Sequence, residues 1–422
     1  MIIRTQEPAV SIPQKINIQP TRQLSTKSGI PVYIIEAGTQ DVVKIELVFA
    51  AGNIAADRPL LALATNDLLD EGTKQHDSAA LAEALDFFGA YLQTENGPDW
   101  SSVSLFSLNK FSNQTLPYLF ELITSPLFPE KEIATYRQQG KQHLAVNLNK
   151  VDFIARRNFF NTLFGANHPY GKLTDEQHYD QINSGILLNY HQEKYLNGLK
   201  AIFISGRPGT ETINSIVTAI DESGFKSASL PEVNIHLPAP EKKFIEKKDA
   251  MQSAIRIGRR LFTRSHPDYF TFSVMSTILG GYFGSRLMTN IREDKGYTYG
   301  IGAGIVSHAQ NGYFYISTEV GAEVREDAVK EIYKEIDLLI HEEVSKEELN
   351  LVKNYLTGAF QRSIDGAFQL ADRHKMVLLN DLNSNYLNEY LEKLNAISPV
   401  DIKICAEKYL QTADLSEIIV GQ

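Results

Sequence analysis

The sequence predicts an α+β fold of two duplicated domains, each a mainly antiparallel sheet packed with helices. The chain has 422 residues, which is more than one ordinary core accommodates. Its composition is that of a globular protein, with 43% hydrophobic and 22% charged residues. The same order of strands and helices can also be read twice along the chain. We therefore expect two domains of about 200 residues each.

The first copy begins with an alternating strand at 41–49 and runs strand, helix, helix, strand, strand, helix, helix. Leucines at helical spacing mark a helix at 59–70, and Ser78 is predicted to cap a second helix that Gly89 ends. The other predicted segments are strands at 90–94 and 100–106 and helices at 115–124 and from 129 onward.

The second copy repeats this order. Its predicted segments are a strand at 250–257, helices at 267–279 and 284–293, strands at 297–305 and 312–319, and helices starting near Val324 and Ser345. A trace of the duplication survives where FPEKEI at 128–133 aligns with VSKEEL at 344–349. The Pro-rich stretch between the copies predicts a linker. We expect an N-terminal domain at 1–229, a linker at 230–243 and a C-terminal domain at 244–422.

Charge and apolar patterning exclude several classes of protein. The 41 Lys and Arg against 51 Asp and Glu give a formal net charge of −10, and no long basic run is present, which disfavours nucleic acid. The apolar runs are far shorter than a membrane span, and residues 1–15 do not form a secretory signal. The single Cys405 excludes an internal disulfide. We expect a cytoplasmic protein that binds neither membrane nor nucleic acid.

The residues by themselves indicate no metal site or nucleophile. No two of the ten histidines have the His-x-x-x-His spacing, and His341 with its neighbouring glutamates is interpreted as a solvent-facing helix surface. Cys405 is predicted to be a small buried apolar residue. The Gly-rich segment 280–284 lacks the Lys and Ser/Thr of a phosphate loop and predicts a turn between two helices.

One segment contains two side chains that could bind a substrate or take part in catalysis. Gly296 ends the short helix, so Arg292 near its end and Tyr299 on the following strand can approach across a tight turn. An Arg fork binds a carbonyl or carboxylate, and a Tyr hydroxyl donates to a developing oxyanion. The alternative is that Arg292 pairs with Glu293 or Asp294 at the surface while Tyr299 packs in the core. The pattern alone favours this alternative.

The segment 284–300 (GSRLMTNIREDKGYTYG) resembles the C-terminal signature of the pitrilysin, or insulinase-type, family of zinc metallopeptidases. Asn197-Gly198-Leu199, the stretch HPYG at 168–171 and EGT at 71–73 are also similar to landmarks of that family. The resemblance covers nearly the whole chain. It implies the duplicated metallopeptidase-like fold of this family, which includes the mitochondrial processing peptidase and bacterial two-chain relatives.

The resemblance also implies that this chain binds no metal. In catalytic members an inverted motif, His-x-x-Glu-His, precedes Gly-Thr, and here its positions hold Leu63, Asn66 and Asp67. The downstream ligand region, QGKQHL at 139–144, contains no acid. A catalytic zinc needs about three protein ligands. We therefore expect no zinc here and zinc in a partner chain.

In the family, an Arg and a Tyr seven residues later reach from the C-terminal half into the zinc site, and Arg292 and Tyr299 match that spacing. This resemblance makes a functional role for Arg292 and Tyr299 the preferred hypothesis, in place of a surface ion pair of Arg292 with Glu293 or Asp294. It implies a zinc-free subunit that pairs with a homologous His-x-x-Glu-His chain and supplies Arg292 and Tyr299 to the partner's site, where peptides are cleaved.

The edge strand at 89–94 is a candidate for binding a peptide substrate by β-augmentation, although the family's Asn in this strand is Gln93 here. An ordinary covered edge is an equal alternative. The residues concerned are Gly89, Ala90, Tyr91, Leu92, Gln93 and Thr94.

Two other hypotheses remain. The chain could be a structural or peptide-binding homologue with no protease partner. The least favoured hypothesis is an independent peptidase with unusual metal ligands. The chain could also pair with itself when alone.

Overall fold

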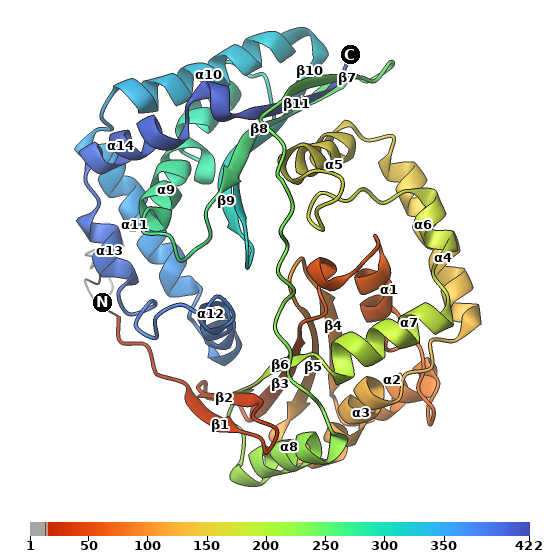
Figure 1. The fold of residues 1–422 in the computed structure, drawn as a ribbon. Helices are drawn as coiled ribbons and strands as arrows, with labels where there is room; N and C mark the ends of the chain where they lie inside the picture. The colour runs from red at the N-terminus through yellow and green to blue at the C-terminus, as the bar shows by residue number, and fades with distance from the viewer. Residues whose placement is uncertain (1–12, 14–15) are drawn as a thin grey trace, which may run out of the picture.

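Two β-sheets of the same strand order form the framework of the molecule (Figure 1). The computed structural model describes Pro13 and residues 16–422. The first sheet has the order β1-β2-β6-β3-β5-β4 and the second the order β7-β11-β8-β10-β9. Apart from β1, the orders match strand for strand. In each sheet one pair is parallel, β2 with β6 and β7 with β11, and the other neighbours are antiparallel. The predicted α+β class and its mainly antiparallel sheets are confirmed.

The strands of the first sheet lie within residues 22–206. They are β1 (Arg22–Ser25), β2 (Pro31–Glu36), β3 (Val42–Phe49), β4 (Tyr91–Asn96), β5 (Ser101–Leu108) and β6 (Leu199–Gly206). The strands of the second sheet are β7 (Lys242–Glu246), β8 (Gln252–Leu261), β9 (Ile301–Ser307), β10 (Gly312–Gly321) and β11 (Ser416–Gly421).

Helices fill the connections of each half. Those of the first half are α1 (Leu61–Asp67), α2 (Ser78–Phe87), α3 (Ser112–Thr124), α4 (Glu130–Asn147), α5 (Val151–Phe164), α6 (Glu176–Asp180), α7 (Ser184–His191) and α8 (Thr210–Ser223). Those of the second half are α9 (Tyr269–Ser276), α10 (Arg325–His341), α11 (Lys346–Arg362), α12 (Ala367–Leu379), α13 (Tyr390–Ala396) and α14 (Pro399–Tyr409), with π-helical turns η4 (Thr277–Gly281) and η5 (Met288–Asp294).

Side-chain caps begin several of these helices where the sequence predicts a start. Asp77 caps α2 by accepting a hydrogen bond from the Ala80 amide, so Ser78 is the first helical residue and not the cap. Ser345 caps α11, and Ser398 forms a capping box with Asp401 at the start of α14. Cys405 is buried on α14, as predicted, and burial raises the pKa of its thiol to about 12.

The Gly-rich segment at 280–284 is the predicted turn between two helices. Gly280 lies so close to β9 that an added Cβ would be 2.5 Å from the backbone nitrogen of Ala303. Only glycine allows this approach. The following strand starts at Ile301 and not at Tyr297, so Tyr299 lies in the loop that precedes β9.

One helix from each half packs against the sheet of the other half. Helix α5 packs against β8 and β11 of the second sheet, and α12 packs against β6 and β2 of the first. The starts of α5 and α12 are separated by the same number of positions as the starts of α4 and α11, so the exchanged helices are copies of one element. Figure 1 shows α5 beside β8 and α12 near β2 and β6.

Buried charge fastens both exchanged helices to their sheets. Lys375 of α12 donates to Glu46 of β3 at 2.6 Å, and Lys44 lies 3.0 Å from the same carboxylate, which is only 2% exposed. Arg256 of β8 pairs in the same way with Asp152 of α5. The two halves are therefore held together by ion pairs as well as by apolar contact.

Hairpins and loops complete the junction between the halves. Residues 225–241 form no helix or strand and run between the sheets in Figure 1. Asp99, in the β4–β5 hairpin, accepts hydrogen bonds from the Tyr170 hydroxyl and, at 2.8 Å, from the Ala309 amide in the β9–β10 hairpin. The ring of His308 stacks on Tyr170 with centroids 4.5 Å apart. The domain boundaries at 229 and 243 stay a prediction.

Candidate functional site

The positions of the lost zinc motif lie on α1. Leu63 and Asp67, one turn apart, share the exposed face, whereas Asn66 is buried and points inward. The Asn66 side-chain amide donates to the Tyr195 hydroxyl at 3.0 Å. Its carbonyl oxygen has no hydrogen-bond partner in the described part of the chain. This position is therefore used in core packing and presents no general base to the face that Leu63 and Asp67 share.

Asp67 is the one ionisable group among the three positions. Its side chain reaches solvent, yet burial by the surrounding protein raises the pKa of its carboxyl to about 6. The hydroxyl of Tyr136 lies 3.4 Å from the carboxylate and lowers the pKa, while the nearby Asp70 charge raises it. The carboxyl is thus mostly ionised at pH 7 but takes up a proton in mildly acidic solution.

Aromatic rings occupy the region of α4 where the family's third ligand would come. The rings of Tyr136 and Tyr179 lie with centroids 6.3 Å apart. A Cβ added at Gly140 would lie 2.1 Å from the Tyr179 ring, so glycine at this position makes room for that ring. Burial raises the pKa of both tyrosines, which keeps their hydroxyls neutral.

These groups do not suit zinc. Structural and catalytic zinc sites use three or four Cys, His or carboxylate ligands. The motif positions of α1 and the rings that face them from α4 and α6 offer one carboxyl, an aliphatic chain, an inward-facing amide and two phenols. Among the described residues, no group of three or more His, Cys, Asp or Glu side chains could hold a metal ion.

Strand β4 is the outer strand of the first sheet and pairs with β5 on one side. Tyr91 and Gln93 are exposed, and no described strand pairs with the second backbone edge of β4. Gly89, at φ 62°, makes the turn into the strand, and Ala90 is buried. The predicted edge position is thus present. Whether it binds peptide remains a prediction.

A pocket that sequence reasoning missed opens beside this edge. It has a volume of about 260 Å³ and an apolar floor formed by α2 and β4. Asp70, Glu71 and Asp86 contribute carboxyls, and burial raises the pKa of Asp70 and Glu71, with their mutual repulsion adding to the shift at Glu71. No spacing signal in the sequence brings these three acids together, because α1 and α2 meet only in the fold.

Arg292 and Tyr299 occupy different surroundings from those of a simple surface pair. Arg292 lies on η5, and its guanidinium stands 4.5 Å from the ring centroid of Phe283, which is 64% exposed. Its nearest carboxylate, Glu293, is 3.9 Å away, beyond hydrogen-bond length. Tyr299 is 96% exposed. The alternative that Tyr299 packs in the core is therefore wrong.

The structure does not join these two side chains directly. No hydrogen bond between Arg292 and Tyr299 is present among the described residues, and both remain open to solvent. Thr298 anchors the intervening loop by donating to the Glu319 carbonyl at 2.7 Å. This fixed loop next to Tyr299 holds its backbone while the side chain projects outward.

Residues 181–356 match the family model described as the peptidase M16 inactive domain. The family resemblance found in the sequence is confirmed at this level, and Arg292 and Tyr299 lie inside the matched range.

Relatives agree with this assignment. A Bacillus subtilis protein called uncharacterized zinc protease YmxG is 22% identical over 78% of this chain and 80% of its own. A Helicobacter pylori protein called non-peptidase homolog YmxG is 24% identical over 80% of this chain and 79% of its own. The solved peptidase M16 inactive domain from Pseudomonas fluorescens superimposes with a TM-score of 0.87 at 23% identity, covering 95% of this chain and 98% of that one.

Within the described residues, no helix is long and apolar enough to cross a bilayer. The cytoplasmic location expected from the sequence stays a prediction.

Proposed function

We propose that this chain is the zinc-free subunit of a two-chain zinc endopeptidase and supplies Arg292 and Tyr299 to its partner's active site. One contrast carries the proposal. The α1 positions cannot hold zinc, yet Tyr299 is 96% exposed and Arg292 has no carboxylate within hydrogen-bond distance among the described residues. The exposed Tyr299 has no evident role in stabilising the chain itself, and Arg292 is held only by the Phe283 ring and a long ion pair with Glu293.

The chemistry of the two groups suits a peptide undergoing hydrolysis. The Arg292 guanidinium offers a planar fork of N–H donors to a backbone carbonyl or carboxylate. The Tyr299 hydroxyl can donate a hydrogen bond to the oxygen that becomes negative when water adds to the scissile carbonyl. The partner would provide the zinc and the general base, which this chain lacks.

The open edge of β4 supports a second element of the proposal. An extended peptide could add to β4 as a further strand through main-chain hydrogen bonds. The adjacent pocket, with its apolar floor and three carboxyls, would then accept a long side chain with a cationic end. Residues 89–94 would thus bind substrate.

A peptide-binding homologue without a protease partner is the second candidate. Two observations favour it: the matching family model is called inactive, and a relative is called a non-peptidase homologue. The open β4 edge and its pocket suit this role equally, because they need no zinc. The two candidates differ in whether Arg292 and Tyr299 matter to cleavage.

The decisive experiment uses the chain alone and mixed with a homologous His-x-x-Glu-His chain encoded nearby. Peptide cleavage and bound zinc are measured for each. We expect neither zinc nor cleavage from the chain alone, and cleavage with zinc in the mixture. The Arg292→Ala and Tyr299→Phe variants should strongly lower cleavage, while Arg207→Ala and Tyr355→Phe, elsewhere on the surface, serve as matched controls.

The outcomes separate the candidates. Full activity of both variants in the complex would remove the proposed roles of Arg292 and Tyr299. Peptide binding without cleavage in any mixture would favour the peptide-binding homologue. Stoichiometric zinc and cleavage by the isolated chain would overturn both and point to an independent peptidase.

A further inference from the structure

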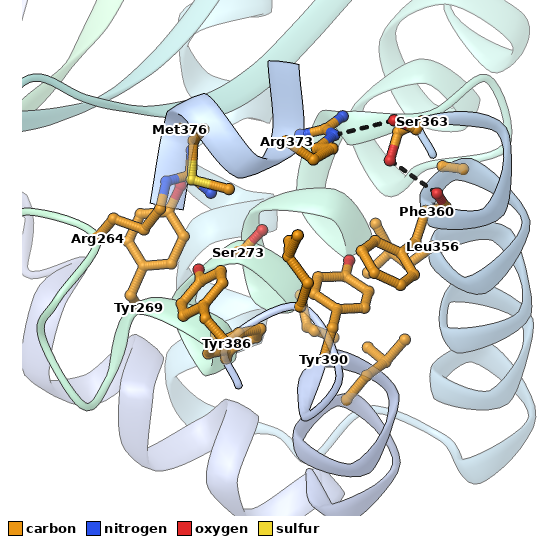
Figure 2. Close-up of a pocket in the computed structure, with 15 residues that line it drawn as sticks. Arg264, Tyr269, Ser273, Leu356, Phe360, Ser363, Arg373, Met376, Tyr386 and Tyr390 are labelled. Atoms are coloured by element: carbon orange, nitrogen blue, oxygen red, sulfur yellow. Dashed lines mark hydrogen bonds between the residues drawn. The ribbon is translucent and has the colours of Figure 1, made fainter. Parts of the chain in front are cut away.

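A pocket in the second half brings two arginines and three tyrosines together around a small space (Figure 2). It has a volume of about 160 Å³ and lies among α9, α11, α12 and the start of α13. Its walls are apolar side chains, including Phe270, Leu356, Phe360, Met376 and Leu394. Among the described residues, no Asp or Glu lines this pocket.

The two arginines of this pocket have no acidic partner. Arg264 places its guanidinium 4.7 Å from the ring centroid of Tyr269. Arg373 reaches the Ser363 carbonyl only at 3.4 Å. Neither guanidinium forms an ion pair with any described residue. In a chain with a net charge of −10, two half-buried cations without a counter-charge are an exception that calls for a ligand.

The duplication supplies an internal reference for Arg373. Its counterpart on the other exchanged helix is Arg157, separated from it by the same number of positions as the starts of the two helices. Arg157 donates to the Asp175 carboxylate at 2.9 Å and to the Thr174 carbonyl at 3.0 Å. In the first half, an acid of the chain thus neutralises this arginine. In the second half no described acid pairs with Arg373, so a bound anion could take that place.

The tyrosines add neutral donors to the same space. In Figure 2 the hydroxyls of Tyr386 and Tyr390 point toward the side of the pocket where Arg264 and Arg373 lie. Burial raises the pKa of Tyr390 to about 12 and also raises the pKa of Tyr269 and Tyr386, so all three remain protonated near neutral pH.

We propose that this pocket binds a small organic anion, with a carboxylate or phosphate head group on an apolar body of a few carbon atoms. The guanidinium forks and phenolic donors match the oxygens of either head group. The aromatic and aliphatic walls match the apolar body, which an inorganic ion would leave uncovered. The small volume excludes a folded peptide.

A wider hollow next to the pocket provides an entrance. It has a volume of about 650 Å³ and shares Arg264, Phe270 and Tyr386 with the inner pocket. Lys393, which pairs with Glu389 at 2.9 Å, lies on its rim together with Asp381 and Asp401. The entrance therefore carries charges of both signs, and the preference for an anion rests on the two arginines of the inner pocket.

The first test needs no mutation. Ligand-observed NMR on the full chain compares benzoate, phenyl phosphate, inorganic phosphate and uncharged benzamide at millimolar concentration. We expect saturable binding of benzoate or phenyl phosphate, with the better of the two identifying the head group, and little or no binding of benzamide. Absence of binding by both organic anions, equal binding of benzamide, or equal binding of inorganic phosphate would overturn the proposal.

The second test assigns the site. Arg264→Gln and Arg373→Gln should each weaken binding of the preferred anion by about tenfold or more, because each removes a charged donor. Arg207→Gln changes the net charge equally but lies on the other half, where Arg207 pairs with Asp41, and should leave the affinity unchanged. Unchanged binding by both pocket variants, with thermal unfolding like that of the parent, would contradict the assignment. A variant that fails to fold leaves the first test decisive.

Discussion

The two halves of this chain share a backbone plan but expose different chemistry. In the first half, Asn66 of α1 points inward, tyrosine rings from α4 and α6 lie against each other, and burial raises the pKa of Asp67 to about 6. In the second half, η5, which takes the place of α2, and the loop after it leave Tyr299 in solvent and Arg292 3.9 Å from the nearest paired carboxylate, that of Glu293. The comparison teaches that a duplicated fold can lose a site in one copy while the strand order, set by apolar contacts, remains.

The largest expected effect tests how the halves are held together. Glu46→Ala would leave Lys44 and Lys375 with only the half-exposed Asp372, 3.6 and 3.2 Å away, as counter-charge. It should cost at most about 3–5 kcal/mol in the free energy of unfolding. Asp152→Ala breaks the corresponding pair of α5, but because Asp152 is 39% exposed the loss should be less than half as large. Urea unfolding of both variants measures the difference, and equal losses would show that the two exchanged helices are fastened alike.

The next effect concerns catalysis in the two-chain complex. Tyr299→Phe should lower kcat by about 10²–10³, equivalent to roughly 2.7–4 kcal/mol, because it removes one oxyanion donor. Tyr136→Phe, which removes a hydroxyl beside the lost motif, should leave kcat near that of the parent. Peptide cleavage under saturating substrate makes the comparison. A large loss from Tyr136→Phe would mean that the first half still takes part in the chemistry.

A matched pair of glycines compares the long helices of the two halves. Gly140→Ala on α4 drives a methyl group into the Tyr179 ring and should destabilise by about 1–3 kcal/mol. Gly358→Ala on α11 meets only the flexible end of Arg362 at 3.5 Å and should stabilise by about 0.5–1 kcal/mol. Thermal or urea unfolding reports both signs. A stabilising Gly140→Ala would show that Tyr179 can leave the position it occupies.

The smallest effect depends on pH. The folded-state pKa of Asp67, about 6, lies above its ordinary value of 3.8 because burial disfavours the carboxylate. The folded chain therefore binds this proton more tightly, and stability falls as pH rises from about 4 to 6. Asp67→Asn should be nearly neutral at pH 4 and stabilise by about 1 kcal/mol at pH 8, after allowance for solvent screening. Unfolding at both pH values measures it, and an equal effect at the two would contradict the raised pKa.

Local patterning was enough to predict the order of elements. Alternation located β3 and β8, leucine spacing located α1, and the glycines at 280–284 marked the turn that Gly280 makes against β9. These features depend on neighbours in the chain, so the sequence contains them directly. The cap of α2 at Asp77 was missed by one position, because Asp and Ser are both good caps and only the backbone bond to Ala80 decides between them.

Surfaces were harder to predict than elements. The alternation of β3 suggests one polar face, yet Lys44 and Glu46 are buried because α12 comes from the other half to cover them. Tyr299 was favoured as a core residue by pattern alone, and it is almost fully exposed. Both depend on contacts between residues far apart in the chain, which periodicity does not record.

The sequence by itself determined that this protein is a duplicated α+β chain whose zinc-motif positions hold Leu63, Asn66 and Asp67. Ligand chemistry follows from residue type, so that loss needed no coordinates. Only the tertiary structure decided that α5 and α12 change places, that Asp70, Glu71 and Asp86 share a pocket, and that Arg264 and Arg373 face one cavity without an acid among the described residues. Burial and charge pairing depend on which segments that are distant in the chain pack together. The repeated strand order does not by itself determine that packing.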